Sequence, residues 1–225
     1  WNFINIEIMK NLIIFGNSVF AEVAIYYFKN FSNYKINYVA CDKKYIKAKH
    51  LSGIKVISTQ KMIKLDKRKY NLFIAVGYSK MNKIRENLYK KFRKLKFKFT
   101  NFVHPTAAVY SLKIGKNNFI MENVSINPHS IIGNNNIFWS SNIIGHHSKI
   151  GDNNFFSGNS TISGSNTVRN NNFFGVNCST KDSVKIGSYC FIDANEYVSA
   201  DLVNEIFFNK KLNPKNRLKT SKIFI

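Results

Sequence analysis

Two adjacent histidines, His146 and His147, are the residues of this chain best suited to catalysis. An imidazole titrates near neutral pH, so it can act as a general base that takes a proton from an attacking amine or hydroxyl. The alternative is that the pair occupies a polar turn without a catalytic role. A metal site is disfavoured, because adjacent histidines in an extended chain point apart and no third ligand has a suitable spacing.

A six-residue repeat surrounds this pair. A period of six matches neither the 3.6 of an α-helix nor the alternation of a half-buried strand. It is typical of a parallel β-helix, in which each hexad forms a short strand and a turn, and three hexads form one coil. With Phe102 and Ala108 extending the register backwards, the repeat predicts about five coils. Apart from one threonine, the repeated residues are all large and apolar: Ile114, Ile120, Ile126, Ile132, Phe138, Ile144, Ile150, Phe156, Ile162, Val168, Phe174, Thr180, Ile186, Ile192 and Val198.

The repeat also predicts a neighbour for His146. Gly164 follows it by 18 residues, which is one full coil, so stacking places the two side by side on one edge of the prism. A glycine lets a ligand approach the backbone, whose N–H can hold a thioester carbonyl as charge develops on its oxygen. A base and an amide donor in this arrangement suit acyl transfer, and transfer from coenzyme A is the leading use of such a prism.

The first half of the chain has a different pattern. Short apolar strands at residues 12–15, 36–41 and 72–76 alternate with helical patterns at about 19–31 and 79–95. This order predicts a small parallel sheet with right-handed crossovers, which binds ligands at the carboxyl ends of its strands. Gly16 stands alone where a dinucleotide fingerprint needs three glycines, and Asp42 suits either a ribose contact or a turn, so structural roles stay open for both. The residues at these strand ends are Gly16, Asn17, Ser18, Asp42, Lys43 and Gly77.

Composition excludes several classes of function. The formal charge is +22, but only five of the 34 basic residues are Arg and no nucleic-acid module accompanies them, so no specific nucleic-acid partner is expected. Three cysteines do not make a disulfide framework and suit a reducing cytoplasm. No run approaches the ~20 apolar residues of a membrane span, so membrane insertion is not expected. Residues 1–8 do not form a secretory signal, and Met9 is the expected start.

Taken together, these segments resemble the bacterial sugar acyltransferases that join a small Rossmann-like domain to a left-handed β-helix. That group includes sialic acid O-acetyltransferases and N-acetyltransferases of nucleotide-linked 4-amino-4,6-dideoxy sugars. The resemblance extends from Met9 to about Arg217. It rests on residues 12–16, Asp42, residues 74–77, residues 102–105 and residues 143–151.

The resemblance implies a cytoplasmic homotrimer with an α/β Rossmann-like domain at 9–100, a left-handed parallel β-helix at 101–200 and a C-terminal cap or tail at 201–225. It implies acetyl-CoA as co-substrate and a nucleotide-linked amino sugar as acceptor, in glycan biosynthesis such as that of lipopolysaccharide. His146 and His147 are the candidate catalytic residues. Gly164, Asn213 and Pro214 are expected to bind acetyl-CoA, and the six residues at the strand ends the acceptor.

The residues around His146 depart from the family pattern. The family reads Glu-His-Asp or Glu-His-Glu at this site, with Asn-Thr before it, whereas Gly145, His147 and Trp139 occupy the corresponding positions here. The acidic neighbour that orients the base is therefore expected to be missing, and the base to be tuned differently. Two alternatives to N-acetylation stay open: sugar O-acetylation of the sialic acid type, and a catalytically degenerate trimeric binding or scaffold protein.

Overall fold

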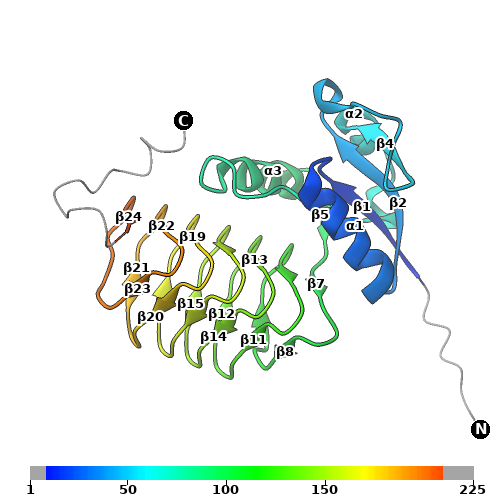
Figure 1. The fold of residues 1–225 in the computed structure, drawn as a ribbon. Helices are drawn as coiled ribbons and strands as arrows, with labels where there is room; N and C mark the ends of the chain where they lie inside the picture. Colours follow the sequence, from blue (N-terminus) through cyan, green and yellow to red (C-terminus); the bar gives the residue numbers. More distant parts are fainter. Residues whose placement is uncertain (1–8, 210–225) are drawn as a thin grey trace, which may run out of the picture. The chain divides into compact units, whose positions relative to one another are not determined.

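The computed structural model describes residues 9–209 and divides into two compact units. Of the described residues, one unit contains 9–76 together with Lys91–Thr100, and the other contains Gly77–Lys90 together with 101–209. The first unit is built on a six-stranded sheet of order β3-β4-β2-β1-β5-β6 (Figure 1). The sheet is parallel except for the β3–β4 pair. Its strands are β1 (Lys10–Phe15), β2 (Tyr34–Cys41), β3 (His50–Leu51), β4 (Ile54–Ser58), β5 (Asn71–Ile74) and β6 (Lys98–Phe99).

The helices agree in part with the sequence patterns. Helix α1 (Val19–Phe31) has the predicted bounds and buries Phe20, Ala24 and Phe28. Helix α3 (Lys83–Lys94) begins four residues later than predicted, because Lys80, Met81 and Asn82 have positive φ angles and form a turn instead. The segment with β3, β4, η1 (Lys43–Tyr45), α2 (Thr59–Ile63) and η2 (Lys67–Lys69) was not predicted.

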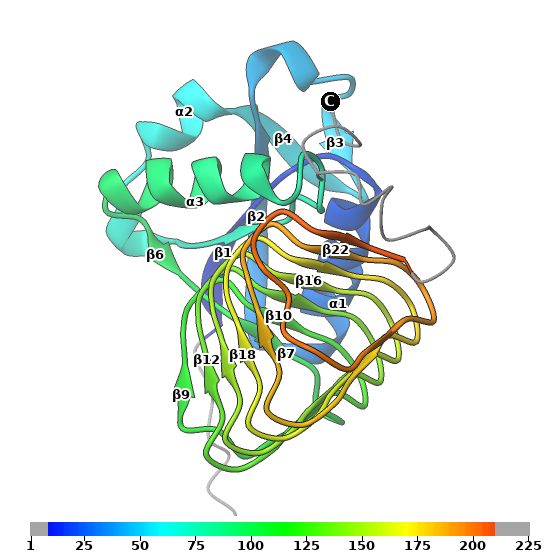
Figure 2. The same ribbon diagram turned by 90° about the vertical axis from the view of Figure 1, so that its left-hand side faces the viewer.

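The second unit contains the predicted β-helix. Two-residue strands form three parallel sheets, seen nearly end-on as the three sides of a coil in Figure 2. The left-handed parallel β-helix is thereby confirmed. The first sheet contains β7 (Phe102–Val103), β10 (Phe119–Ile120), β13 (Ile137–Phe138), β16 (Phe155–Phe156), β19 (Phe173–Phe174), β22 (Phe191–Ile192) and β24 (Phe207–Phe208). The second sheet contains β8 (Ala108–Val109), β11 (Ser125–Ile126), β14 (Ile143–Ile144), β17 (Thr161–Ile162), β20 (Ser179–Thr180) and β23 (Tyr197–Val198). The third sheet contains β9 (Lys113–Ile114), β12 (Ile131–Ile132), β15 (Lys149–Ile150), β18 (Thr167–Val168) and β21 (Lys185–Ile186).

The repeated apolar residues form the core of this unit. Each residue of the series Ile114 to Val198 is the second residue of a strand, and those from Ile120 to Val198 are buried. The corners between strands adopt left-handed φ angles at every sixth residue, and most of these residues are Asn or Ser. Asn tolerates this conformation better than most residues, which explains the Asn-rich turns.

The register predicted for the first coil is wrong by one residue. Val109, not Ala108, pairs with Ile126 and packs against the core. In the same coil, Phe102 pairs with Phe119 rather than with Ile120. The corner between Val109 and Ile114 holds one residue fewer than the later corners, so the period slips there.

Two further sequence predictions concern cysteines and helices. Cys41, Cys178 and Cys190 are all free and buried, and burial raises the pKa of the Cys178 thiol to about 11. Within residues 9–209, no helix is both long and apolar enough to cross a membrane.

Candidate active site

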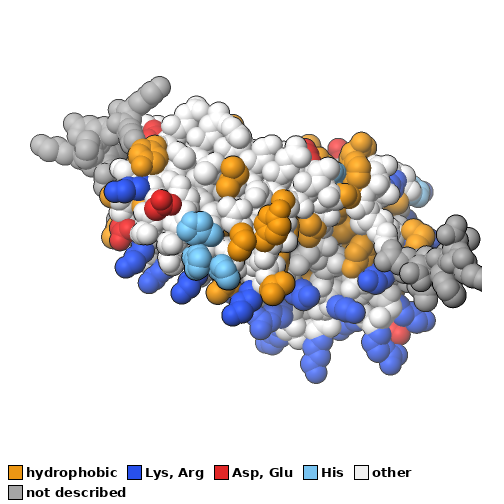
Figure 3. Space-filling model, turned by 90° about the horizontal axis from the view of Figure 1, so that it is seen from below, with side chains coloured by type: hydrophobic (Ala, Val, Ile, Leu, Met, Phe, Trp, Pro, Cys, Tyr) orange, Lys and Arg blue, Asp and Glu red, His pale blue; other side chains and the backbone are white. Residues whose placement is uncertain are grey.

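The two histidines lie on one corner of the β-helix, in the turn between β14 and β15. Both side chains are exposed, and their Nδ1 atoms are 3.0 Å apart in a hydrogen bond. His147 has a φ of 58° and stacks on His129 from the coil before, with 4.7 Å between the ring centroids. Figure 3 shows histidine side chains gathered on one face beside exposed hydrophobic side chains. The Nε2 atom of His146 is the nitrogen that remains for proton transfer.

Gly164 lies beside His146, as the 18-residue spacing predicts. A Cβ atom added to Gly164 would be 3.0 Å from His146 Nε2 and 2.8 Å from His146 Cε1. Asp182 follows one coil later, and its Oδ1 would be 3.3 Å from the same Cβ. Within the described part of the chain, the Gly164 N–H donates no hydrogen bond to another residue. The geometry thus brings together an imidazole, an amide N–H and a carboxylate.

The position before His146 has no space for a side chain. A Cβ on Gly145 would lie 2.5 Å from the Ser163 carbonyl carbon and 2.6 Å from the Gly164 nitrogen. An acidic residue there would therefore push the coils apart. Trp139, the other unusual residue, is half-buried, and its ring centroid lies 6.3 Å from that of Phe155.

In the first unit, four candidate residues lie in loops at the carboxyl ends of β1 and β2. Asn17 Nδ2 donates to the Tyr45 carbonyl at 2.5 Å, which ties these two loops together. Asp42 Oδ1 accepts a hydrogen bond from Thr59 Oγ1 at 2.5 Å, and Lys43 is exposed. Ser18 occupies the N-cap position of α1, but its side chain makes no capping hydrogen bond.

Gly16, between β1 and this loop, is required by the backbone. Its φ is 137°, and a Cβ there would lie 2.3 Å from the Ala75 carbonyl oxygen at the end of β5. The sheet order reverses between β1 and β5, and parallel α/β sheets bind ligands at such a switch point. Both the structural and the binding interpretation of Gly16 are compatible with this position.

The remaining candidates fall elsewhere. Gly77 belongs to the second unit, where its carbonyl accepts a hydrogen bond from Arg85 Nη1 at 2.8 Å. Asn213 and Pro214, predicted to bind the cofactor, lie outside the described residues.

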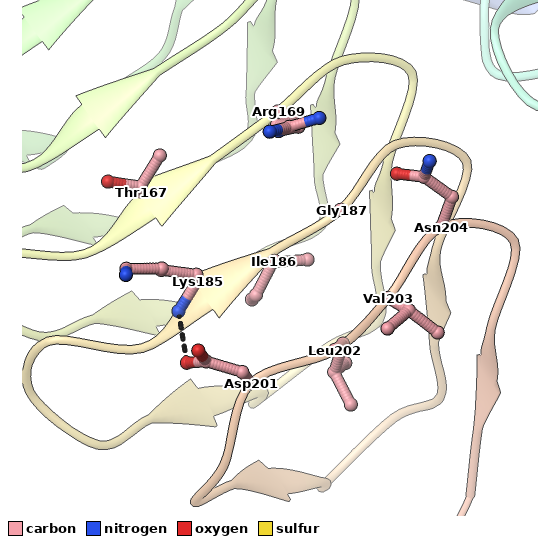
Figure 4. A pocket seen from close by; sticks show the side chains of 9 residues that line it. All are labelled: Thr167, Arg169, Lys185, Ile186, Gly187, Asp201, Leu202, Val203 and Asn204. Carbon is pink, nitrogen blue, oxygen red and sulfur yellow. Dashed lines mark hydrogen bonds between the residues drawn. The ribbon is translucent and has the colours of Figure 1, made fainter.

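One feature near the histidines was not predicted, a pair of cavities over the third sheet. A cavity of about 350 Å³ is lined by residues of β18 and β21 and by Asp201–Asn204, including Arg169, Lys185 and Asp201 (Figure 4). A second cavity of about 460 Å³ shares Thr167 and Arg169 with it and adds Lys149. Lys149 of β15, Arg169 directly after β18 and Lys185 of β21 thus place three cations on this surface. The signal in the sequence was Arg169 itself, an arginine in a chain whose cations are mostly lysine.

Several solved structures resemble most of this chain. The structure of PerB from Caulobacter crescentus, in complex with CoA and GDP-perosamine, is 24% identical in sequence, with a TM-score of 0.78 over 88% of this chain and 93% of that one. The acetyltransferase domain of PglB from Neisseria gonorrhoeae, in complex with acetyl coenzyme A, is 19% identical, with a TM-score of 0.78 over 88% and 94%. WeeI from Acinetobacter baumannii is 15% identical, with a TM-score of 0.73 over 88% and 95%.

The chain has the fold of these proteins. In addition, residues 11–92 match the family model of the PglD N-terminal domain. No curated protein sequence is similar enough to the chain to count as a match. The fold class predicted from the sequence is confirmed, and the matched domain supports the predicted resemblance.

Proposed function

We propose that the protein is an acetyl-CoA-dependent N-acetyltransferase of a nucleotide-linked amino sugar. The observation that carries the proposal is the position of the His146 imidazole over Gly164, where a Cβ atom on the glycine would be 3.0 Å from His146 Nε2. Names of the similar structures support it: perosamine N-acetyltransferase with CoA and GDP-perosamine, and an acetyltransferase domain with acetyl coenzyme A. One of them is a variant of the perosamine enzyme with a histidine replaced by asparagine.

The roles follow from the donors and acceptors present. His146 Nε2 removes the proton from the attacking amine as its nitrogen bonds to the thioester carbon, and the Gly164 N–H stabilises the negative charge that develops on the thioester oxygen. The C–S bond then breaks, and the leaving thiolate of CoA takes the proton back from His146. Asp182 lies one coil further along the same edge, beside Gly164, and its carboxylate would favour the cation that forms on His146. Desolvated amines are already nucleophilic, so a base of ordinary strength suffices for N-acetylation.

The nucleotide is held by the first unit, at the carboxyl ends of its strands. The main support is the hydrogen bond from Asn17 to the Tyr45 carbonyl, which joins the segments that follow β1 and β2. The same two segments contain Gly16, Ser18, Asp42 and Lys43. In this proposal, the residues that select the acceptor and those that transfer the acetyl group come from different segments of the chain.

The test is a substrate panel. Purified protein is incubated with acetyl-CoA and with nucleotide-linked sugars that carry either an amine or a hydroxyl at the variable position, and free CoA and acetylated product are measured. Product from amino sugars alone supports the proposal, and product from hydroxy sugars alone identifies an O-acetyltransferase instead. A folded protein that binds no acetyl-CoA by calorimetry is a binding or scaffold protein.

Gly164→Ala is expected to lower kcat roughly tenfold or more and to change the unfolding temperature little. The φ of Gly164 allows alanine, but the new methyl group would displace the imidazole of His146, and small misplacements of a base reduce the rate strongly. Steady-state kinetics and a thermal melt provide the two readouts. Gly158→Ala is the matched control, since its methyl group would meet only Ser140 O at 3.7 Å. Equal kcat values for Gly164→Ala and Gly158→Ala would contradict the role assigned to Gly164 beside the His146 imidazole.

Arg169→Gln is expected to raise the KM for acetyl-CoA by ~10-fold and to leave kcat within about twofold. We assign the surface with Lys149, Arg169 and Lys185 to the phosphates of coenzyme A, because guanidinium–phosphate bonds are charge-assisted. Initial rates at varied acetyl-CoA measure both constants. Arg93→Gln, an exposed arginine of α3, is the control. An unchanged KM would remove Arg169 from the cofactor site.

We further propose a homotrimeric state and a cytoplasmic location. Exposed apolar side chains lie next to the histidine corner, among them Tyr110, Leu112 and Ile131, and Leu112 is fully exposed. Such a patch suits contact with another copy of the chain. The free buried thiols fit a reducing compartment. Light scattering on the purified protein measures the oligomeric state.

A further inference from the structure

The proposed base is held by a second imidazole. The bond between His146 Nδ1 and His147 Nδ1 is 3.0 Å long, and the two rings are almost perpendicular, at 85°. A hydrogen bond between two ring nitrogens needs one proton, so one ring donates and the other accepts. For His146 Nε2 to accept a proton from the amine, His146 must carry its own proton on Nδ1. His147 Nδ1 is then the acceptor.

No carboxylate replaces His147 in this role among the described residues. Gly145 has no space for a side chain, as shown above. The carboxylate of Asp182 lies beside Gly164, and within the described residues it makes no hydrogen bond or ion pair with His146. The orientation and the tautomer of His146 therefore depend on His147.

His147 is itself held in place by its backbone and by stacking. Its φ of 58° directs the chain through the left-handed corner, and its N–H donates to the Pro128 carbonyl at 3.2 Å. Its ring stacks on that of His129, which has the equivalent corner position one coil earlier, with a φ of 63°. The ring thus presents Nδ1 to His146 from a fixed position.

An imidazole differs from a carboxylate in one respect that matters for catalysis. Protonated His147 would carry a proton on each nitrogen, so two donors would face each other at the His146 bond and the bond would be lost. A carboxylate remains an acceptor throughout the range in which histidine titrates. The titratable groups facing this pair are His129 and Asp182, with the exposed Lys149 and Lys181 beside them in sequence.

We propose that His147 is the positioning residue of His146 and that the enzyme is active only when both rings are neutral. This inference rests on the proposed function, because it assigns a partner to the proposed base. It predicts that acidification removes activity through two protonations rather than one. The plot of log kcat/KM against pH is then expected to approach a slope of 2 on its acid side.

Two substitutions at this corner separate positioning from folding. Asn and Ser both occur at equivalent corners of this chain, as Asn159 and Ser165 show, so both tolerate the backbone. The carbonyl oxygen of His147→Asn can take the place of Nδ1 as an acceptor that does not titrate, whereas the hydroxyl of His147→Ser is too short to do so. We expect His147→Asn to retain most of the kcat with an acid slope of 1. We expect His147→Ser to lose ~10-fold in kcat with an unchanged KM for acetyl-CoA.

A spectroscopic readout makes the test independent of acetyl transfer. Long-range ¹H–¹⁵N correlation spectra of the whole protein report which ring nitrogen of His146 carries the proton. The proposal expects the Nδ1–H form in the wild type and in His147→Asn, and a mixture of tautomers in His147→Ser. If these spectra agree but the protein acetylates no sugar, the histidine pair stands and the proposed function fails. If His147→Ser keeps the wild-type kcat, the wild-type acid slope of log kcat/KM and the wild-type tautomer of His146, the positioning role of His147 is overturned.

Discussion

Replacing His146 with alanine is expected to lower kcat by ~10²-fold or more and to leave the affinity for acetyl-CoA nearly unchanged. General-base catalysis contributes roughly 10²–10⁴-fold, and alanine removes the base without a substitute. The cations Lys149, Arg169 and Lys185, which we assign to the cofactor, are not altered by this change. The binding constant should therefore stay the same while the chemical step slows.

Steady-state kinetics with the best substrate of the panel measures this effect, together with calorimetric titration of acetyl-CoA. His50→Ala is the control, since His50 is an exposed histidine on β3 in the first unit. Because His146 is exposed, the variant is expected to fold, and its melting temperature verifies this. Turnover within about twofold of the wild type would remove His146 from the mechanism, whatever the substrate.

The sequence predicted the β-helix well because its period is regular. Each repeat ends on a buried residue such as Ile144 or Ile162, and the number of residues per coil alone put Gly164 beside His146. The predicted strand register failed where the number of residues per corner changed, at the shortened corner between Val109 and Ile114. A missing residue in a corner leaves no apolar signal, so the slip became visible only in the strand pairing.

The first unit was harder to predict from patterns. Strands β3 and β4 form a short hairpin around Ser52 and Gly53, both with positive φ. β3 has only two residues, and β4 reads Ile-Lys-Val-Ile-Ser, which does not alternate strictly between apolar and polar residues. The start of α3 was placed too early because the left-handed turn at residues 80–82 is made of Lys, Met and Asn, which as residue types are compatible with a helix.

The details of the site depend on side-chain contacts that the spacing of residues in the sequence cannot predict. The spacing placed His146 next to Gly164, but the bond between His146 and His147 depends on side-chain rotation about a left-handed corner. Arg85 is a stronger example. It lies in the lysine-rich helix α3, yet it is completely buried and hydrogen-bonded to residues 50 to 69 positions later in the chain.

Arg85 anchors the segment Gly77–Lys90 to the β-helix within the second unit. Its guanidinium donates to the main-chain carbonyls of Asn135, Asn153 and Asn154 at 3.1 Å and of Gly77 at 2.8 Å. Burial lowers the pKa of Arg85 to about 9, so the group is still charged at neutral pH. A charged donor shared by several buried carbonyls gives stronger hydrogen bonds than a neutral one.

Replacing Arg85 with methionine is therefore expected to destabilise the protein by about 3–5 kcal/mol. Each carbonyl left without a donor costs roughly 1–3 kcal/mol, and the relief from burying a charge offsets part of the sum. Methionine fills much of the same volume, so the loss reports the hydrogen bonds rather than a cavity. For a chain of this length, the expected fall in Tm is ~6–20 °C.

Thermal unfolding followed by circular dichroism measures the change. Arg93→Met is the matched control, because Arg93 lies on the same helix with an exposed side chain and is expected to be nearly neutral in stability. A Tm for Arg85→Met within about 2 °C of the Arg93→Met value would contradict the anchoring role, because a buried guanidinium that holds these carbonyls cannot be lost without that cost.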